Sequence, residues 1–383
     1  MAEFIRYGEH GGPEVLILVE GPVPEAPADG VVVEVRAAGV NPVDWKIRSG
    51  KRGERDFSQP QGMGSDAAGV VVAVGDSVDP ADGVGVGDEV IVHGARGTYA
   101  SHLVATPGQL IPKPSALGFE QAAALGIPAG TAYQVLRSLG LGEGETLLVH
   151  GGSGGVGQAA IQFARESGAN VVATASPANH GRLRELGAIA VAYGPGLLDR
   201  LRAVSPNGYD VVLDAAGTDE AIDASLELVP DRDRIATIVR MKDAAGLGIR
   251  TWSGAIPSTM TPETLRLRAV SPNGYDVVLD AAGTDEAIDA SLELVADRDR
   301  IATIVRMKDA AGLGIRTWSG AIPSTMTPET LRLRAEGVAE AARLAAEGRF
   351  DVEIAARYPL AEAADAQRQS ETRHVRGKIV LIP

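Results

Sequence analysis

A 66-residue block occurs twice in tandem and limits what this chain can fold into. Residues 200–265 match residues 266–331 position for position, and the one difference is Pro230 against Ala296. Solenoids and propellers need three or more units, so two near-identical copies do not indicate such an architecture. A recent duplication, an engineered insertion and a sequence-assembly artefact each fit the pattern. Without one copy the chain would have 383 − 66 = 317 residues, and we predict the fold for that shorter sequence.

The composition fits two domains and excludes several classes of function. The chain has 383 residues, of which 45% are hydrophobic, enough for two cores. Its net charge of −14 argues against non-specific binding to nucleic acid or to an anionic membrane. The absence of cysteine removes disulfides, thiolate zinc sites and cysteine nucleophiles. We find no signal-peptide pattern at the N-terminus and no apolar run near the ~18 residues of a membrane span, and therefore expect a cytoplasmic protein.

The pattern of apolar residues changes near residue 120. Residues 1–120 contain short apolar runs broken by Gly and Pro, which predict a mostly β domain. In residues 121–351 short apolar strands alternate with helical segments, a pattern typical of βαβ units with a parallel sheet. The final stretch GKIVLIP reads as a strand that returns to the first domain, so residues 352–383 are expected to complete it. The predicted fold class is α/β.

A glycine-rich turn carries the sharpest chemical signal. The strand predicted at 146–150 leads into GGSGGVG, and a helix follows at once. Glycine lets the backbone turn tightly and approach a pyrophosphate, and the helix N-terminus attracts the phosphates. The motif alone could be an ordinary glycine-rich loop, but strand, turn, helix and second strand in order predict a dinucleotide site. Its predicted cofactor-binding residues are Gly152, Ser153, Gly154, Gly155, Val156 and Gly157.

The end of the next strand indicates which dinucleotide is bound. An NAD site usually carries Asp or Glu about 20 residues after the glycines, whereas this strand ends in VVATASPANHGR. Hydroxyl and cationic side chains suit a 2′-phosphate, so Ser176 and Arg182 favour NADP. The alternative for Arg182 is a solvated helix residue.

Three further motifs carry a resemblance to a known family. GVNPVDWKIRSG (39–50), GSDAAGVVVAVG (64–75) and GVGDEV (85–90), together with the glycine-rich turn, resemble the medium-chain dehydrogenase/reductase superfamily. The closer likeness is to its zinc-free quinone oxidoreductase, or zeta-crystallin-like, branch. The resemblance implies a GroES-like β-rich catalytic domain, a Rossmann doubly wound domain, and a cleft between them. It also implies a homodimer that reduces a quinone or an α,β-unsaturated carbonyl with NADPH.

The same resemblance suggests catalytic residues and no metal. Zinc-dependent members have Cys and His where this chain has Asn41 and Ser65, so we predict no metal site. Asn41 and Lys46 are candidates to polarise the substrate carbonyl. A partly desolvated Lys46 could also donate a proton, although many relatives have Tyr there and an exposed cation is the alternative. Asp44 is either catalytic or a helix cap.

Two more residues and the repeat are placed by the family fold. Thr131 is implied near the nicotinamide, and Tyr193 near the adenosine phosphate, unless Tyr193 is a core aromatic. Each copy of the repeat supplies the fourth to sixth strands of the nucleotide-binding sheet, with Gly217 at the cofactor-facing end of the fourth. The second copy lacks a glycine-rich turn and is surplus, and either copy could fill the sheet.

Two other functions remain open at this stage. One is a trans-acting enoyl reductase of polyketide-type assembly, which the NPVDWK loop also resembles and which would need an acyl-carrier partner. The other is a nucleotide-binding structural or regulatory protein that has lost catalysis, a reading to which the repeat lends some weight.

Overall fold

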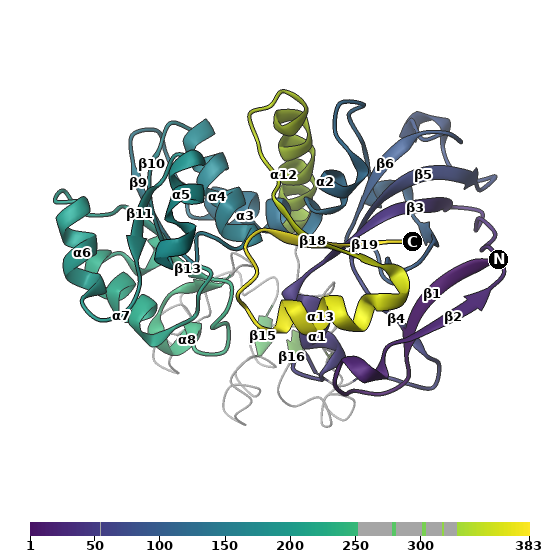
Figure 1. Ribbon diagram of the computed structural model, residues 1–383, viewed down its shortest axis with the longest axis horizontal. Coiled ribbons are helices and arrows are strands. Elements are labelled where there is room, and N and C mark those ends of the chain that lie inside the picture. The colour runs from purple at the N-terminus through teal and green to yellow at the C-terminus, as the bar shows by residue number, and fades with distance from the viewer. Residues whose placement is uncertain (54, 252–277, 281–300, 304–315, 318–327) are drawn as a thin grey trace, which may run out of the picture.

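The computed structural model describes residues 1–53, 55–251, 278–280, 301–303, 316–317 and 328–383. Two halves lie on either side of the long helix α12 (Pro328–Ala346), a β-rich half that holds both termini and an α/β half (Figure 1). Short 3₁₀ turns connect several elements: η1 (Pro13–Val15), η2 (Pro80–Asp82), η3 (Pro107–Gln109), η4 (Pro177–Asn179), η5 (Arg232–Arg234) and η8 (Leu360–Glu362).

The β-rich half is built on two sheets. The larger has the order β18-β19-β3-β5-β6-β8, with β7 also paired to β3, and the smaller has the order β2-β1-β4. The strands are β1 (Ala2–Tyr7), β2 (Ile17–Gly21), β3 (Val31–Val40), β4 (Gln61–Gly62), β5 (Asp66–Val74), β6 (Glu89–His93), β7 (His102–Ala105), β8 (Leu110–Pro112), β18 (Ile354–Pro359) and β19 (Lys378–Ile382). Because β19 pairs antiparallel with β3, the last strand of the chain lies beside the strand that leads into helix α1 (Pro42–Arg48).

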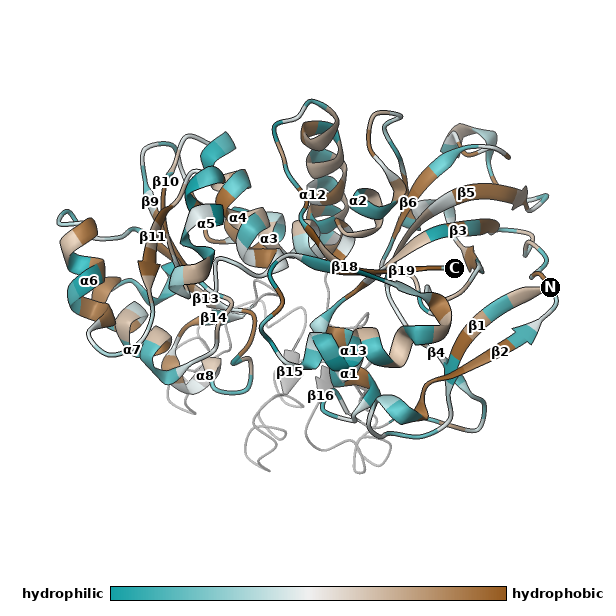
Figure 2. Cartoon of the chain, in the orientation of Figure 1, coloured by the Kyte–Doolittle hydropathy of each residue, from teal (hydrophilic) through white to brown (hydrophobic). Residues whose placement is uncertain are grey.

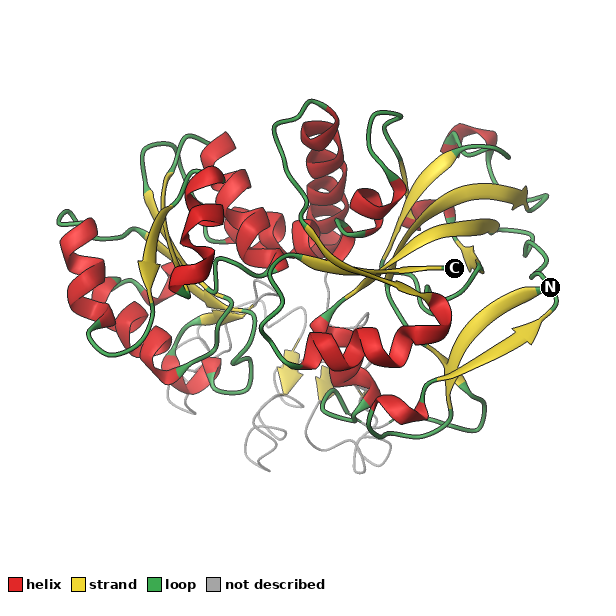
Figure 3. Ribbon diagram, in the orientation of Figure 1, coloured by secondary structure: helices red, strands yellow, loops and turns green. Residues whose placement is uncertain are grey.

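The α/β half is a doubly wound parallel sheet. Its order, β11-β10-β9-β12-β13-β14, is the 3-2-1-4-5-6 order of dinucleotide-binding folds, so the predicted fold class is confirmed. The strands are β9 (Thr146–His150), β10 (Asn170–Ala175), β11 (Ile189–Ala192), β12 (Val211–Asp214), β13 (Ile235–Thr237) and β14 (Arg250–Thr251). The helices of this half are α3 (Gly126–Ser138), α4 (Gly155–Glu166), α5 (His180–Glu185), α6 (Leu197–Val204), α7 (Asp219–Leu228) and α8 (Ala244–Leu247). Helices α2 (Phe119–Ala123) and α13 (Ala363–Glu371) pack on strands of the β-rich half. Figure 3 shows helices of the α/β half on both sides of its strands.

Burial on both faces explains the continuous apolar runs of the parallel strands. In β9, Leu147 and Val149 join a core with α3, α4 and α12, whereas Leu148 faces the opposite side with Leu201 and Tyr209. Strand β3 has a separate core with β5 and β19. The apolar stretches of these strands are brown in Figure 2.

The two copies of the repeat occupy different sheets. The first copy supplies β12, β13 and β14 of the doubly wound sheet, which answers the question that the sequence left open. From the second copy, β15 (Val278–Asp280), β16 (Ile301–Thr303) and β17 (Arg316–Thr317) form a parallel sheet of their own. The registers are the same: Val212 pairs with Ile235, and 66 residues later Val278 pairs with Ile301.

Candidate active site

The glycine-rich turn has the geometry that a dinucleotide needs. Gly151 adopts a φ of 78° directly after β9, a conformation that favours glycine. A Cβ on Gly157 would lie 2.3 Å from the Gly151 carbonyl oxygen, and one on Gly152 would lie 2.8 Å from the Ala173 Cβ. Side chains at these positions would clash with the backbone or the core. The turn therefore leaves bare peptide groups at the N-terminus of α4, an arrangement that suits a pyrophosphate.

Polar side chains line the carboxyl ends of four adjacent strands. His150, Thr174, Asp214 and Thr237 end or nearly end β9, β10, β12 and β13, and all four are buried. Thr237 Oγ1 donates to Asp214 Oδ2 over 2.7 Å, and His150 Nδ1 lies 3.3 Å from Thr174 Oγ1. Burial lowers the pKa of His150 to about 4, so this imidazole is neutral at pH 7. The row marks the edge of the sheet where ligands bind in such folds.

Asp214 shapes the loop that follows β12. Its Oδ1 accepts from the backbone N–H groups of Ala216 (3.0 Å) and Gly217 (2.8 Å). Gly217 has a φ of 72°, and a Cβ there would lie 2.4 Å from Val239 Cγ1. The loop is thus tightly turned at the switch point of the sheet, next to the glycine-rich turn, where the sequence placed Gly217.

Arg182 has partners that the sequence did not reveal. Its side chain is 11% exposed, and Nη1 lies 2.7 Å from Asp351 Oδ2. Nε donates to Gln158 Oε1 over 3.1 Å and lies 3.6 Å from Glu353 Oε2. Carboxylates from the segment before β18 therefore hold the guanidinium, so Arg182 is not a solvated helix residue. Among the described residues its Nη2 is buried and has no hydrogen-bond partner.

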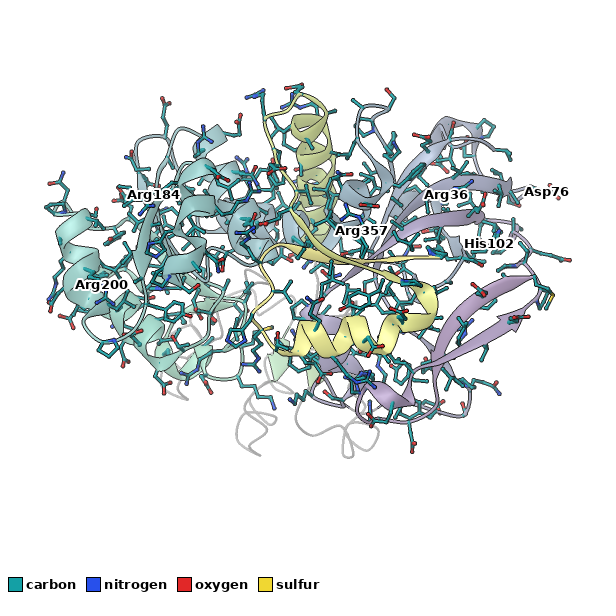
Figure 4. All side chains as sticks on the ribbon, in the orientation of Figure 1. Arg36, Asp76, His102, Arg184, Arg200 and Arg357 are labelled. Carbon is teal, nitrogen blue, oxygen red and sulfur yellow. The ribbon has the colours of Figure 1, made fainter. Side chains whose placement is uncertain are left out.

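Ser176 and Tyr193 lie at the carboxyl ends of the neighbouring strands β10 and β11. Ser176 follows β10, and its Oγ accepts from Asn179 Nδ2 over 3.2 Å. Tyr193 follows β11 and is 57% exposed, so it is not a core aromatic. Arg200 donates to the carbonyl oxygens of Ala192, Gly194 and Pro195 and holds this loop. Figure 4 shows Arg200 and Arg184 on the side of the nucleotide-binding half away from the β-rich half.

Asn41 and Asp44 form the N-terminal cap of α1. Asp44 Oδ2 accepts from the Asn41 backbone N–H over 2.8 Å in a reciprocal capping box. The same oxygen accepts from Tyr99 Oη over 2.8 Å. This geometry is the helix cap that the sequence offered as one reading of Asp44.

The Asn41 side chain lies inside a buried polar network. Its Nδ2 donates to Asp66 Oδ2 over 2.9 Å and to the Gly39 carbonyl over 3.4 Å, and its Oδ1 accepts from Lys378 Nζ. Asn41 is only 1% exposed. The nitrogen and the oxygen of the side-chain amide therefore both have partners. Asn41 holds Asp66 and Lys378 in place instead of offering a free donor to a substrate.

Burial controls the protonation of this network. It raises the pKa of Asp44 to about 7, although the Asn41 N–H and the Tyr99 hydroxyl oppose the rise. Burial also raises the pKa of Asp66 and lowers that of Lys378, and the two opposite charges partly offset these shifts. These pKa shifts favour the neutral forms of Asp44, Asp66 and Lys378, because a charged group is costly to bury.

The network reaches the nucleotide-binding half through three contacts. Ile127 N, in α3, donates to Asp66 Oδ2 over 2.8 Å. Gly377, next to Lys378, donates its N–H to the Ser153 carbonyl over 3.2 Å. Thr131 Oγ1 accepts from Arg334 Nη2 over 2.7 Å, and Asp66 opposes the fall in the Arg334 pKa, which burial lowers to about 10. These contacts connect the network that caps α1 to the glycine-rich turn and to α3.

Lys46 lies apart from Asn41 and Asp44, on the more exposed part of α1. Its Nζ is 5.6 Å from the centre of the Trp45 ring. Burial lowers the pKa of Lys46, and the positive charges of Arg52, Arg373 and Lys51 lower it further. This is the environment expected of a lysine that gives up its proton readily.

The sequence analysis missed four members of the site: Asp66, Tyr99, Arg334 and Lys378. Asp66 belongs to the GSDAAG motif and Lys378 to the terminal GKIVLIP strand. A charged residue inside each apolar strand pattern was the available signal, since charges are rarely buried without a partner. Among the described residues, no group of three or more His, Asp or Glu side chains could hold a metal ion.

Known proteins resemble the chain along most of its length. The GroES-like domain of alcohol dehydrogenases matches residues 27–115, and two families called zinc-binding dehydrogenase match residues 155–250 and 255–381. The 2-methylene-furan-3-one reductase of Solanum lycopersicum is 32% identical over 295 residues, covering 72% of this chain and 74% of that protein. The chain belongs to the medium-chain dehydrogenase/reductase superfamily, in its quinone oxidoreductase branch. The resemblance stated from the sequence is confirmed.

Two further relatives show how much of each protein the similarity covers. The quinone oxidoreductase of Mus musculus is 44% identical over 176 residues, 45% of this chain and 51% of that protein. The chain therefore spans about half the length of this relative. The structure of Escherichia coli quinone oxidoreductase complexed with NADPH matches with a TM-score of 0.70 and 26% identity, covering 100% of both chains. None of the described helices has the length and apolar character needed to cross a membrane.

Proposed function

We propose that this chain is an NADPH-dependent, zinc-independent reductase of quinones or α,β-unsaturated carbonyls. One observation carries the proposal: the glycine-rich turn at the carboxyl edge of the doubly wound sheet is joined, through Gly377 and Lys378, to the buried network that caps α1. A dinucleotide on that edge would lie along the contact between the two halves. The E. coli relative that carries NADPH in its structure supports the choice of cofactor.

The residues of the turn fit the cofactor. Residues 152–157 would hold the pyrophosphate with backbone N–H groups, with Ser176 and Tyr193 at the adenosine end and Thr131 and Gly217 at the nicotinamide end. NADPH, when bound, supplies the hydride. Gly217 lets its loop approach closely because a side chain there would meet Val239. Arg334 fixes the Thr131 hydroxyl.

Lys46 is the residue that we assign to the substrate oxygen. Negative charge develops there as the carbonyl or quinone is reduced, and a cationic donor stabilises it. The lowered pKa of Lys46 favours proton donation. Asn41 and Asp44 act as positioning residues because their hydrogen bonds are already made within the protein. They cap the N-terminus of α1, which carries Lys46 in its last turn.

Zinc independence rests on residue chemistry. The chain contains no cysteine, and Asn41 and Ser65 stand where the zinc-dependent branch has its ligands. We expect activity to survive prolonged chelation, and a stoichiometric zinc needed for turnover would contradict this part of the proposal. The proposal also includes a homodimer, which the family resemblance implies, and a cytoplasmic location. Sedimentation analysis tests the dimer.

Two measurements test the function. NADPH fluorescence titration should show binding, and NADPH oxidation with 1,4-naphthoquinone should show turnover. In a pH series, kcat/KM should fall on the alkaline side with a midpoint below 10.5, the usual pKa of lysine, and Lys46→Gln should remove this limb. Binding without turnover would favour a regulatory protein, and turnover only with an acyl carrier would favour the enoyl reductase.

A further inference from the structure

The surface beside Lys46 carries a concentration of positive charge that the proposed reaction does not require. A cavity of about 180 Å³ lies between the end of α1, the loop at Gly11 and Gly12, and the end of α13. Trp45, Lys51 and Arg373 line it, and Lys46 and Arg52 adjoin it closely enough for their charges to interact. The whole chain has a net charge of −14, so the cations here are a local exception.

These cations are arranged around one aromatic ring. Lys51 Nζ lies 5.0 Å and Arg373 Cζ 5.8 Å from the centre of the Trp45 ring, and Lys46 Nζ is also within 6 Å. Cation–π contacts of this kind hold the charges without neutralising them. The Trp45 indole N–H is buried and, in the part of the chain that the structure describes, makes no hydrogen bond. It is a further donor with an unmet requirement.

In the part of the chain that the structure describes, no carboxylate is ion-paired with the cluster. The acidic residue that lines the cavity, Glu371, is ion-paired with the buried Arg48. Within the described ranges, no ion pair involves Lys46, Lys51, Arg52 or Arg373. Four cations within reach of one another repel unless an anion joins them, and the cavity is large enough for one.

The backbone conformation of Arg373 also indicates a functional site. Its φ of 59° makes it the only non-glycine residue with a positive φ among those described. A helix end in this conformation usually has Gly or Asn, because a Cβ is strained there. Strain of this kind is characteristic of functional sites. The arginine side chain is therefore retained at a position that the fold would fill more easily with glycine.

The cluster faces the nicotinamide end of the proposed cofactor site. Arg52 Nη1 lies 3.6 Å from Met241 Sδ, and Met241 follows β13, at the carboxyl edge of the sheet. In folds with this strand order the ribose of the adenosine binds at the end of the second strand, which here is β10, on the other side of β9. An anion in the cavity would therefore belong to the substrate and not to the 2′-phosphate of the cofactor.

We propose that the cluster of Trp45, Lys46, Lys51, Arg52 and Arg373 binds an anionic group, a carboxylate or sulfonate, on the substrate. The proposal rests on the reductase function and narrows its substrate to quinones or enones that carry a negative charge. Lys46 would then serve both the anion and the reacting oxygen nearby, whereas Lys51 and Arg373 would serve the anion alone.

The test compares 1,4-naphthoquinone with 1,4-naphthoquinone-2-sulfonate. In the wild type, kcat/KM for the sulfonate should fall with added salt, because its attraction is screened, and that for the neutral quinone should not. Arg373→Gly should raise KM for the sulfonate about tenfold, the effect of one lost charge-assisted hydrogen bond. The neutral quinone should keep its KM and show only the upward shift of the alkaline limb that follows when the Arg373 charge no longer lowers the pKa of Lys46. The substitution should not lower Tm, because glycine suits the positive φ.

Two controls keep the outcome clear. Arg368→Gln removes an exposed arginine of α13, the helix that Arg373 follows, paired with Asp365, and should leave both substrates unaffected. Calorimetric titration with naphthalene-2-sulfonate, which cannot be reduced, tests the anion site without turnover. If the protein binds naphthalene-2-sulfonate, and Arg373→Gly and Lys51→Gln weaken this binding, but neither quinone is reduced, the reductase proposal is wrong and the anion-site proposal stands. Equal effects of Arg373→Gly on both quinones, or no binding of the sulfonate, would overturn the proposal.

Discussion

At the scale of single residues, Asp44 shows how burial and hydrogen bonding oppose each other. Two donors favour its charged form, yet burial outweighs them and raises the pKa to about 7. The oxygen that accepts both hydrogen bonds does so whether or not the other oxygen is protonated. Neutral Asp44 can therefore keep the cap of α1 without placing a charge beside Asp66.

The first prediction is that ionisation of Asp44 destabilises the fold as pH rises towards 7, an effect that a variant unable to ionise at this position isolates. A carboxyl whose pKa is raised on folding stabilises the fold fully below its unfolded value, 3.8, and this contribution is lost as pH rises through about 7. Asp44→Asn keeps the acceptor and cannot ionise. The difference in free energy of unfolding between Asp44→Asn and the wild type should therefore increase in favour of the variant between pH 4 and 7.5, by no more than about 4 kcal/mol. Denaturant titrations at four pH values test this, and parallel curves would contradict it.

The second prediction concerns Arg182, for which sequence and structure point to different roles. A phosphate ligand would make Arg182→Gln weaken NADPH selectively, by about 1.5–3 kcal/mol. From its contacts with Asp351 and Glu353 we expect a loss of stability of about 1–3 kcal/mol instead, and equal, small changes in the Kd of NADPH and NADH. Arg202→Gln, which breaks the exposed pair with Glu227, should cost at most about 1 kcal/mol. A selective loss of NADPH would restore the phosphate role.

At the scale of elements, the sequence predicts what is local and misses what is distant. The turn between β9 and α4 is specified by consecutive residues, because only glycine tolerates its φ and its close contacts. The buried network joins Asn41 to Lys378, 337 residues away, and no local pattern encodes such a pair. The capping role of Asp44 could be predicted from the sequence because the cap is local. Its hydrogen bond with Tyr99 could not, because Tyr99 lies 55 residues further along the chain.

The third prediction compares two glycine-to-alanine changes. In Gly157→Ala the new Cβ would lie 2.3 Å from the Gly151 carbonyl oxygen, so the turn must open and NADPH binding should fall by at least about tenfold. A Cβ on Gly181, inside α5, would meet no neighbouring atom within 4 Å, so Gly181→Ala should leave binding unchanged and raise stability by about 0.5–1 kcal/mol. Fluorescence titration and thermal unfolding of both variants test this pair. Unchanged NADPH affinity in Gly157→Ala would remove the turn from the cofactor site.

At the scale of the whole molecule, the repeat raises a question of competition. The same three strands pair in the same register in both sheets, so either copy carries the sequence that the doubly wound sheet accepts. The first copy begins at Arg200, inside α6, and leads directly into β12. Consecutive elements usually lie side by side. A second set of strands with the same pairing is a source of frustration during folding and of exchange between chains.

The fourth prediction is that deleting residues 266–331 leaves NADPH binding intact and raises stability. The deletion joins Leu265 to Arg332 and restores the sequence PETLRLRAEG, with which α12 begins. It removes a 66-residue insertion whose closure costs on the order of 4 kcal/mol if unstructured, an amount that the pairing of three short strands only partly offsets. Ten residues, 252–261, then connect β14 to α12 and can span at most about 35 Å. Tm with and without NADPH tests the outcome, and a deletion protein that no longer binds NADPH would show that the second copy is required.

A second deletion supplies the matched control. Removing residues 200–265 instead leaves the same sequence except that Ala296 stands in place of Pro230. Val229, before the proline, is extended with φ −123° and ψ 101°, the conformation that a following proline favours. Proline at a compatible site restricts the unfolded chain, so the deletion that keeps Pro230 should be more stable by about 0.4–1 kcal/mol. Equal NADPH affinity in the two deletions would show that either copy can complete the sheet, whereas loss of binding in only one would tie the cofactor site to that copy.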